Sequence, residues 1–186
     1  MEPAVRELEK KDPAVAIVWR AFELRPDPVP TLDPNGDYLH NVWGSSVYPL
    51  AEQLRIDIKL PPVQPRSRRA HEAAHWARRH GKFREYNDAL FRAFFQRGED
   101  IGNIDVLTRL ASDMVLDGDD LREALDNHLH LENVLADELE AKKLGLRGVP
   151  AFIANRNIAL SGVQSLGSLQ KFVEHASSYL RTLPDD

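Results

Sequence analysis

The segment HEAAH, residues 71–75, has the sharpest chemical pattern in the sequence. On a helix, two histidines four positions apart can bind zinc from one face, and the glutamate beside the first histidine can activate a water molecule. A zinc site also needs a third ligand. The longer form of this motif has glycine and histidine where this sequence has Arg78 and Gly81. We therefore expect neither a metal site nor a metalloprotease.

A second candidate site is Gly148-Val149-Pro150, which stands between a charged helical pattern and a short apolar run. Proline lacks the N–H that a β-ladder uses, so it seldom precedes a strand without a structural purpose. The bond before a proline can also be cis, which suits a close approach to a site. We predict a cis Val149–Pro150 bond and take these three residues as the candidate binding residues.

Cysteine is absent from the sequence, whereas seven histidines are present. The chain therefore has no disulfide, no thiolate nucleophile and no cysteine-ligated zinc. The histidines form no serine–histidine–aspartate arrangement that their spacing supports. The sequence also lacks the G-x-S-x-G, P-loop and G-x-G-x-x-G motifs. No cofactor is predicted.

The composition is that of an ordinary globular protein, with 42% hydrophobic and 28% charged residues in a chain of 186. The net charge of −5 argues against nucleic acid or an anionic membrane as a partner, since phosphate binding needs clustered Lys and Arg. The cluster Arg66, Arg68 and Arg69 is interpreted as a solvated helix start. The sequence shows neither a membrane-spanning run nor a signal-peptide core, and we expect a cytoplasmic protein.

Hydrophobic periodicity predicts the elements that must position these residues. The apolar, β-branched run at 14–24 predicts a strand buried on both faces. The segments VPAFIA and NIALSG predict a hairpin that turns at Asn155-Arg156-Asn157, because asparagine tolerates positive φ. The order of helix, strand, several helices, hairpin and helix predicts an α/β fold. Helical patterns cover 2–10, 38–55, 67–80, 83–95, 101–114, a segment that begins at Asp119 or Asp120, 131–144 and 166–180.

Four segments occur in a distinctive order, namely WRAFELRP, QPRSRRAHEAAHWAR, FREYNDALFRAFFQRGEDIGN and AKKLGLRGVPAFIANRNIALSGVQS. In this order they resemble the DsbA family of thioredoxin-fold proteins, and its FrnE-like branch in particular. The family also includes 2-hydroxychromene-2-carboxylate isomerases and kappa-class glutathione transferases. The resemblance extends from about residue 2 to residue 180, although Arg66 stands where the family commonly has asparagine.

The resemblance implies a thioredoxin-like fold with a large helical insertion, formed as one DsbA-like domain over residues 1–186. The insertion would cover 38–145, and 146–183 would form the C-terminal hairpin and helix of the thioredoxin core. In this family the proline of G-V-P is cis and faces a C-x-x-C motif. The backbone before that proline pairs with an extended peptide or with glutathione by β-augmentation. Gly148, Val149 and Pro150 would therefore bind a peptide or a small thiol such as glutathione.

The sequence departs from the family at its start. The C-x-x-C motif should follow a first strand and open the first helix, but Met1 already lies within the expected helix. The N-terminal strand and the motif are thus missing, and the chain is expected to be inactive in disulfide exchange, which requires a thiolate. Three interpretations stay open: a thiol–disulfide oxidoreductase with a truncated start, a redox-inactive peptide-binding module, or a glutathione-dependent isomerase or transferase.

The missing strand also affects the expected sheet. It lies centrally in the thioredoxin fold, so Val15, Ile17 and the strand around Phe152 should have unpaired backbone edges. Unpaired buried N–H and C=O groups cost about 1–3 kcal/mol each. We expect either direct pairing of the two flanking strands or a homodimer that shares a strand. The dimer is favoured, because open edges recruit other chains.

Overall fold

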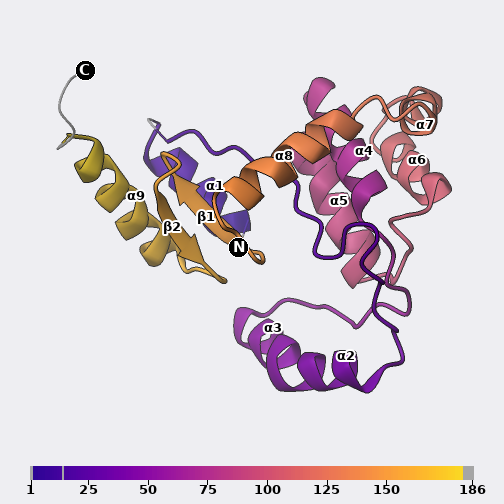
Figure 1. Cartoon of the computed structure of the whole chain (residues 1–186), viewed down its shortest axis with the longest axis horizontal. Coiled ribbons are helices and arrows are strands. Elements are labelled where there is room, and N and C mark those ends of the chain that lie inside the picture. Colours follow the sequence, from indigo (N-terminus) through magenta and orange to yellow (C-terminus); the bar gives the residue numbers. More distant parts are fainter. Residues whose placement is uncertain (1, 14, 182–186) are drawn as a thin grey trace. The chain divides into compact units, whose positions relative to one another are not determined.

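The computed structural model describes residues 2–13 and 15–181, which form two compact units (Figure 1). One unit combines the described residues up to Leu24 with those from Leu139 onward, and the other spans Arg25–Glu138. Positions 14, 182 and 183 of the expected elements lie outside the described residues. Within the described ranges, none of the helices has both the length and the apolar character needed to cross a membrane.

The unit Arg25–Glu138 is helical, as the periodicity predicts. The pattern over residues 38–55 forms two α-helices joined by one π-helical turn, η1. Asp117 caps α7 by accepting from the N–H groups of Asp119 and Asp120, so this helix begins slightly earlier than expected. The elements are α2 (Asp37–Val42), η1 (Trp43–Val47), α3 (Tyr48–Leu54), α4 (Arg68–Arg79), α5 (Phe83–Phe95), α6 (Ile104–Ser112), α7 (Gly118–Asp126) and the first part of α8 (Leu131–Lys143).

The core of this unit is built around α4, whose buried face carries small side chains that allow neighbouring helices to approach closely. Trp76 lies in this core and donates from Nε1 to Oδ2 of Asp120 at 2.6 Å, which ties α4 to α7. The hydroxyl of Tyr86 donates to the carbonyl of Leu107 at 2.9 Å and ties α5 to α6. The buried alanines of α4 are Ala70, Ala73, Ala74 and Ala77.

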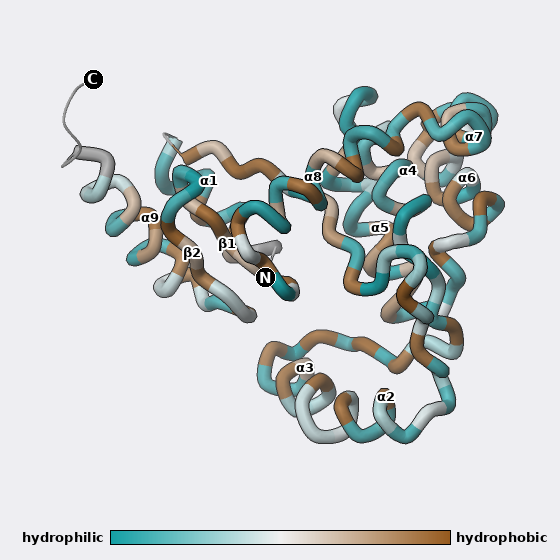
Figure 2. Tube along the Cα trace, viewed as in Figure 1, coloured by the Kyte–Doolittle hydropathy of each residue, from teal (hydrophilic) through white to brown (hydrophobic). Residues whose placement is uncertain are grey.

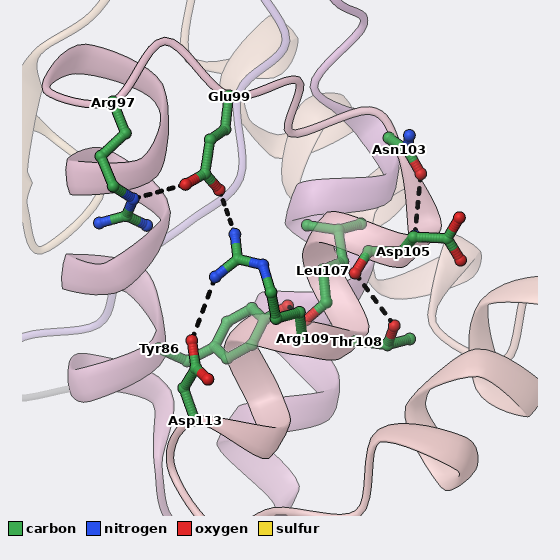
Figure 3. A network of polar contacts seen from close by, with 9 residues as sticks. All are labelled: Tyr86, Arg97, Glu99, Asn103, Asp105, Leu107, Thr108, Arg109 and Asp113. Carbon is green, nitrogen blue, oxygen red and sulfur yellow. Dashed lines mark hydrogen bonds and ion pairs between the residues drawn. The ribbon is translucent and has the colours of Figure 1, made fainter.

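Charged side chains connect α5 and α6 at the surface (Figure 3). Glu99 forms ion pairs with Arg97, whose Nε lies 2.5 Å from Oε1, and with Arg109. Arg109 also lies 3.1 Å from the carboxylate of Asp113, one turn further along the chain. The side chain of Asn103 caps α6. Because these groups are solvent-accessible, they fix the local geometry of the connection more than they stabilise the fold.

The other unit contains α1 (Glu2–Lys11), β1 (Ala151–Ala154), β2 (Ile158–Ser161) and α9 (Leu166–Arg181). The two strands form an antiparallel hairpin in which Phe152 lies opposite Leu160, and both side chains pack on the same core as Leu169 of α9. Asn155 and Arg156 have φ values of 52° and 61°, so the hairpin turns where the sequence predicts. Figure 1 shows this hairpin beside α9.

The prediction of a strand at residues 14–24 is wrong, because residues 15–24 form no ladder with any described segment. The hairpin is the only sheet in the described part of the chain, so direct pairing of the two expected edges does not occur. Residues 15–20 nevertheless alternate between half-buried and exposed. Val15, Ile17 and Trp19 pack on the core that Phe152 and Leu160 also contact. The segment therefore has the side-chain alternation of a strand but belongs to no β-ladder among the described residues, and Figure 2 shows its apolar character.

Candidate functional site

The candidate residues Gly148–Pro150 lie in the connection from α8 to β1. The helix end directs the chain into this connection. Gly145 has a φ of 69°, which glycine adopts without strain, and its N–H donates to the carbonyl of Lys142 at 3.1 Å. The N–H of Leu146 donates to the carbonyl of Ala141 at 3.0 Å. These two bonds form a Schellman-type helix end, which fixes where the candidate segment begins.

The hairpin fixes the other end of the segment. The carbonyl of Pro150 accepts from the N–H of Gly162 at 2.8 Å, which continues the pairing of β1 with β2 by one residue. The Val149–Pro150 bond is cis. The structure thus holds Pro150 on the hairpin and leaves the residues before it at the surface.

Val149 is the most available residue of the segment. The residue is exposed, with a relative accessibility of 50%. Neither its N–H nor its C=O forms a hydrogen bond with any described residue. A Cβ added to Gly148 would meet no atom within 4 Å, so the space beside the backbone is open. An extended ligand could therefore pair with the backbone N–H and C=O of Val149 from the solvent side.

The HEAAH residues take part in packing instead. Glu72 is buried, with 1% of its surface exposed, and its Oε1 lies 3.4 Å from Nδ1 of His128. Nε2 of His75 lies 3.1 Å from Oδ2 of Asp137. No three potential ligands converge on a metal position within the described ranges. Glu72 and His75 thus bind two separate partners in the segment 128–137.

These residues belong to a larger group that the sequence reasoning missed. His130 is buried nearby, with 5% of its surface exposed, and its Nδ1 lies 3.3 Å from Oδ1 of Asn133. Burial lowers the pKa of His130 below the ordinary value of 6.5. The signal in the sequence was the occurrence of two histidine-containing segments, HEAAH and HLH at 128–130. We call Glu72, His75, His128, His130 and Asp137 the histidine–carboxylate cluster.

Arg66 also has a role that differs from the one expected. Its Nη1 donates to the carbonyls of Arg25 and Val29 at 3.2 and 3.1 Å, and its Nη2 lies 2.8 Å from Oδ1 of Asp27. The interpretation of Arg66 as part of a solvated helix start is therefore wrong. Guanidinium donors suit this task because they fan out in one plane toward several acceptors. The loop that Arg66 binds contains a second cis bond, Asp27–Pro28, which the sequence did not lead us to expect.

The hairpin with its flanking helices, and the cis-proline connection that leads into β1, fit a thioredoxin-like domain of the α/β class. The model of the DSBA-like thioredoxin domain matches residues 1–174, and the chain belongs to this family. The chain is 38% identical over 144 residues to the uncharacterized protein YwbO of Bacillus subtilis (strain 168), a match that covers 75% of this chain and 72% of YwbO.

A solved structure shows the same fold. The probable DsbA oxidoreductase SCO1869 of Streptomyces coelicolor superposes with a TM-score of 0.76 at 23% sequence identity. The superposition covers 100% of this chain and 84% of the other. At this level of identity the likeness supports the fold, and the function has to be argued from the residues of this chain.

Proposed function

We propose that this chain is a DsbA-family domain that binds an extended peptide at Gly148–Pro150 and does not itself exchange disulfides. The observation that carries the proposal is the exposed residue Val149 just before β1, whose backbone N–H and C=O form no hydrogen bond with the described residues. Its N–H can donate to a peptide carbonyl and its C=O can accept from a peptide N–H. This pairing is the backbone contact of β-augmentation.

The chemistry of exchange requires a sulfur nucleophile, and this chain has no cysteine. Binding without covalent capture then depends on non-covalent contacts alone. Two backbone hydrogen bonds contribute about 1–3 kcal/mol in total, whereas a millimolar dissociation constant corresponds to about 4 kcal/mol. Apolar contacts with the exposed Val149 side chain have to supply the rest, so we expect weak binding, with a dissociation constant of about a millimolar.

Gly148 offers a sharp test, because an added methyl group there has open space around it and should not disturb the fold. A ligand that approaches the backbone closely would meet this methyl group. The substitution Gly148→Ala should weaken binding of an extended apolar peptide severalfold, measured by peptide titration in NMR spectra. Gly44→Ala is the matched control, because a Cβ at Gly44 also meets no atom within 4 Å and the residue lies in η1 of the helical unit.

Two results would contradict the proposal. Equal peptide binding by the two alanine variants would remove Gly148–Pro150 as the site. Reduction of insulin by the purified chain above the buffer rate would show disulfide chemistry without cysteine.

Titration with glutathione in the same NMR spectra separates a peptide ligand from a small thiol. Chemical-shift changes at Val149 with glutathione and none with peptides would favour the glutathione-dependent alternative.

A further inference from the structure

The helical unit contains a second polar site that peptide binding does not use. It lies where α4 contacts the segment His128–Asp137. We propose that the histidine–carboxylate cluster is a proton-sensitive latch: it holds His128–Asp137 on α4 while His130 is neutral, and loosens this segment when His130 takes up a proton.

Two bridges attach the segment to one face of α4. Glu72 contacts His128 where the segment begins, and His75 contacts Asp137 where it ends. Residues three and seven positions apart lie on the same side of a helix, so Glu72, His75 and Arg79 share a face. The partners lie 56 and 62 residues apart in sequence, so these bridges hold tertiary structure together rather than a local turn.

His130 is the residue of the segment that a proton would affect most. It is buried, and among the described residues its side-chain partner is the neutral amide of Asn133. No carboxylate accepts a hydrogen bond from its ring in the described structure. A charge placed there would lose its water without gaining an ion pair, which disfavours the charged form.

The groups around His130 shift its pKa in both directions. Burial is the main cause that lowers the pKa of His130, and the electrostatic effects of Arg79 and His75 act in the same direction. The contact with Asn133 and the negative charge of Glu72 oppose the shift. Asp137 is hydrogen-bonded to His75. The net shift of the His130 pKa is downward, so the folded structure favours the neutral form of His130.

The two bridges themselves depend little on the charge of their histidines. His128 gains little from Glu72, because its side chain is 54% exposed and solvent screens the pair. The bond between His75 and Asp137 already forms when a neutral imidazole donates its N–H. The free-energy cost of charging the buried His130 therefore decides how the segment responds to acid.

The direction of the pH effect follows from linkage. When the segment opens, His130 regains water and its pKa returns toward the ordinary value of 6.5. Below that pH the open state binds a proton that the closed state does not hold. The closed state therefore has its full stability above the ordinary pKa and loses stability as the pH falls through it toward the lowered pKa of the folded form.

Hydrogen exchange on the full chain tests the latch. Amides of residues 127–138 should exchange severalfold faster at about pH 5.5 than at about pH 7.5, one unit on either side of the ordinary histidine pKa, after correction for the intrinsic exchange rate. Amides of α5 should not change. The substitution His130→Gln should abolish this difference, whereas His40→Gln, at an exposed histidine of the same unit, should keep it.

A measurement on the unmodified chain keeps the test decisive if His130→Gln does not fold. The ring protons of His130 should titrate below the ordinary histidine pKa of 6.5 in NMR spectra. A His130 midpoint at or above 6.5 would overturn the proposal. Amide exchange in residues 127–138 that is unchanged or slower in acid would overturn the proposal too. In that case the two bridges would stabilise the closed segment at least as much as protonation of His130 destabilises it.

Discussion

Tyr86 places a hydroxyl in the fully buried core of the helical unit, where the carbonyl of Leu107 is its acceptor. The substitution Tyr86→Phe keeps the ring but leaves that carbonyl without this donor. We expect the free energy of unfolding to fall by about 1 kcal/mol, measured by urea denaturation. Tyr38→Phe is the control: Tyr38 is 63% exposed, and its substitution should change stability by less than about 0.5 kcal/mol. Equal effects of the two substitutions would contradict this account.

The same hydroxyl predicts a response to alkaline pH. Burial raises the pKa of Tyr86 above its usual value of 10.0, so the folded chain keeps this proton. The unfolded chain loses the proton as the pH passes 10.0, and stability therefore falls above that pH. The slope of stability against pH in this range should be smaller in Tyr86→Phe than in the unmodified chain.

At the scale of elements, Arg66 connects the start of α4 to the loop 25–29 through three acceptors. The substitution Arg66→Ala removes all three contacts. Amides of residues 25–30 should then exchange faster with solvent, and proteases should cut there more readily, because short loops depend on such tertiary contacts for their order.

Arg69→Ala is the matched control for this prediction. Arg69 lies three residues further along and donates to the carbonyl of Gly102 at 3.4 Å, away from the loop. Its replacement should leave exchange in 25–30 unchanged. If Arg66→Ala also leaves exchange in the loop unchanged, the loop is held by other contacts and Arg66 does not fix it.

At the scale of the whole molecule, the two units differ in how much core they bury. The helical unit has a continuous cluster drawn from four helices, whereas the cluster of the other unit has three buried members, Val5, Leu8 and Leu169. Apolar burial is the main favourable term in folding. We expect a chain of residues 25–145, which keeps α8 whole, to fold alone with helical circular dichroism and a cooperative thermal transition.

The reciprocal chain is the control, with residues 1–24 joined to 146–181 by a flexible linker. It should show little cooperative unfolding, because a core cluster of three buried residues and a hairpin of two four-residue strands give too little core for independent stability. A cooperative transition in this chain, or its absence in residues 25–145, would reverse the assignment of where the stability lies. A homodimer that shares a strand stays a prediction, which sedimentation of the full chain can test.

The sequence alone determined the elements whose cause is local. Periodic apolar residues fixed the helices, and Asn155 with its neighbours fixed the hairpin turn, because both depend on residues a few positions apart. The order of its motifs also led to the family, which the comparison with the DSBA-like thioredoxin domain confirms.

Tertiary structure decided the features that need a distant partner. Residues 15–20 have the alternation of a strand, but a strand requires a neighbouring ladder, and the described chain supplies none. Arg66 meets its acceptors across about 40 residues of chain, and Glu72 and His75 meet theirs across 56 and 62. Spacing along a helix shows which side chains share a face. What that face contacts depends on how distant segments fold back on it, and so a pattern typical of a zinc site became part of a histidine–carboxylate cluster.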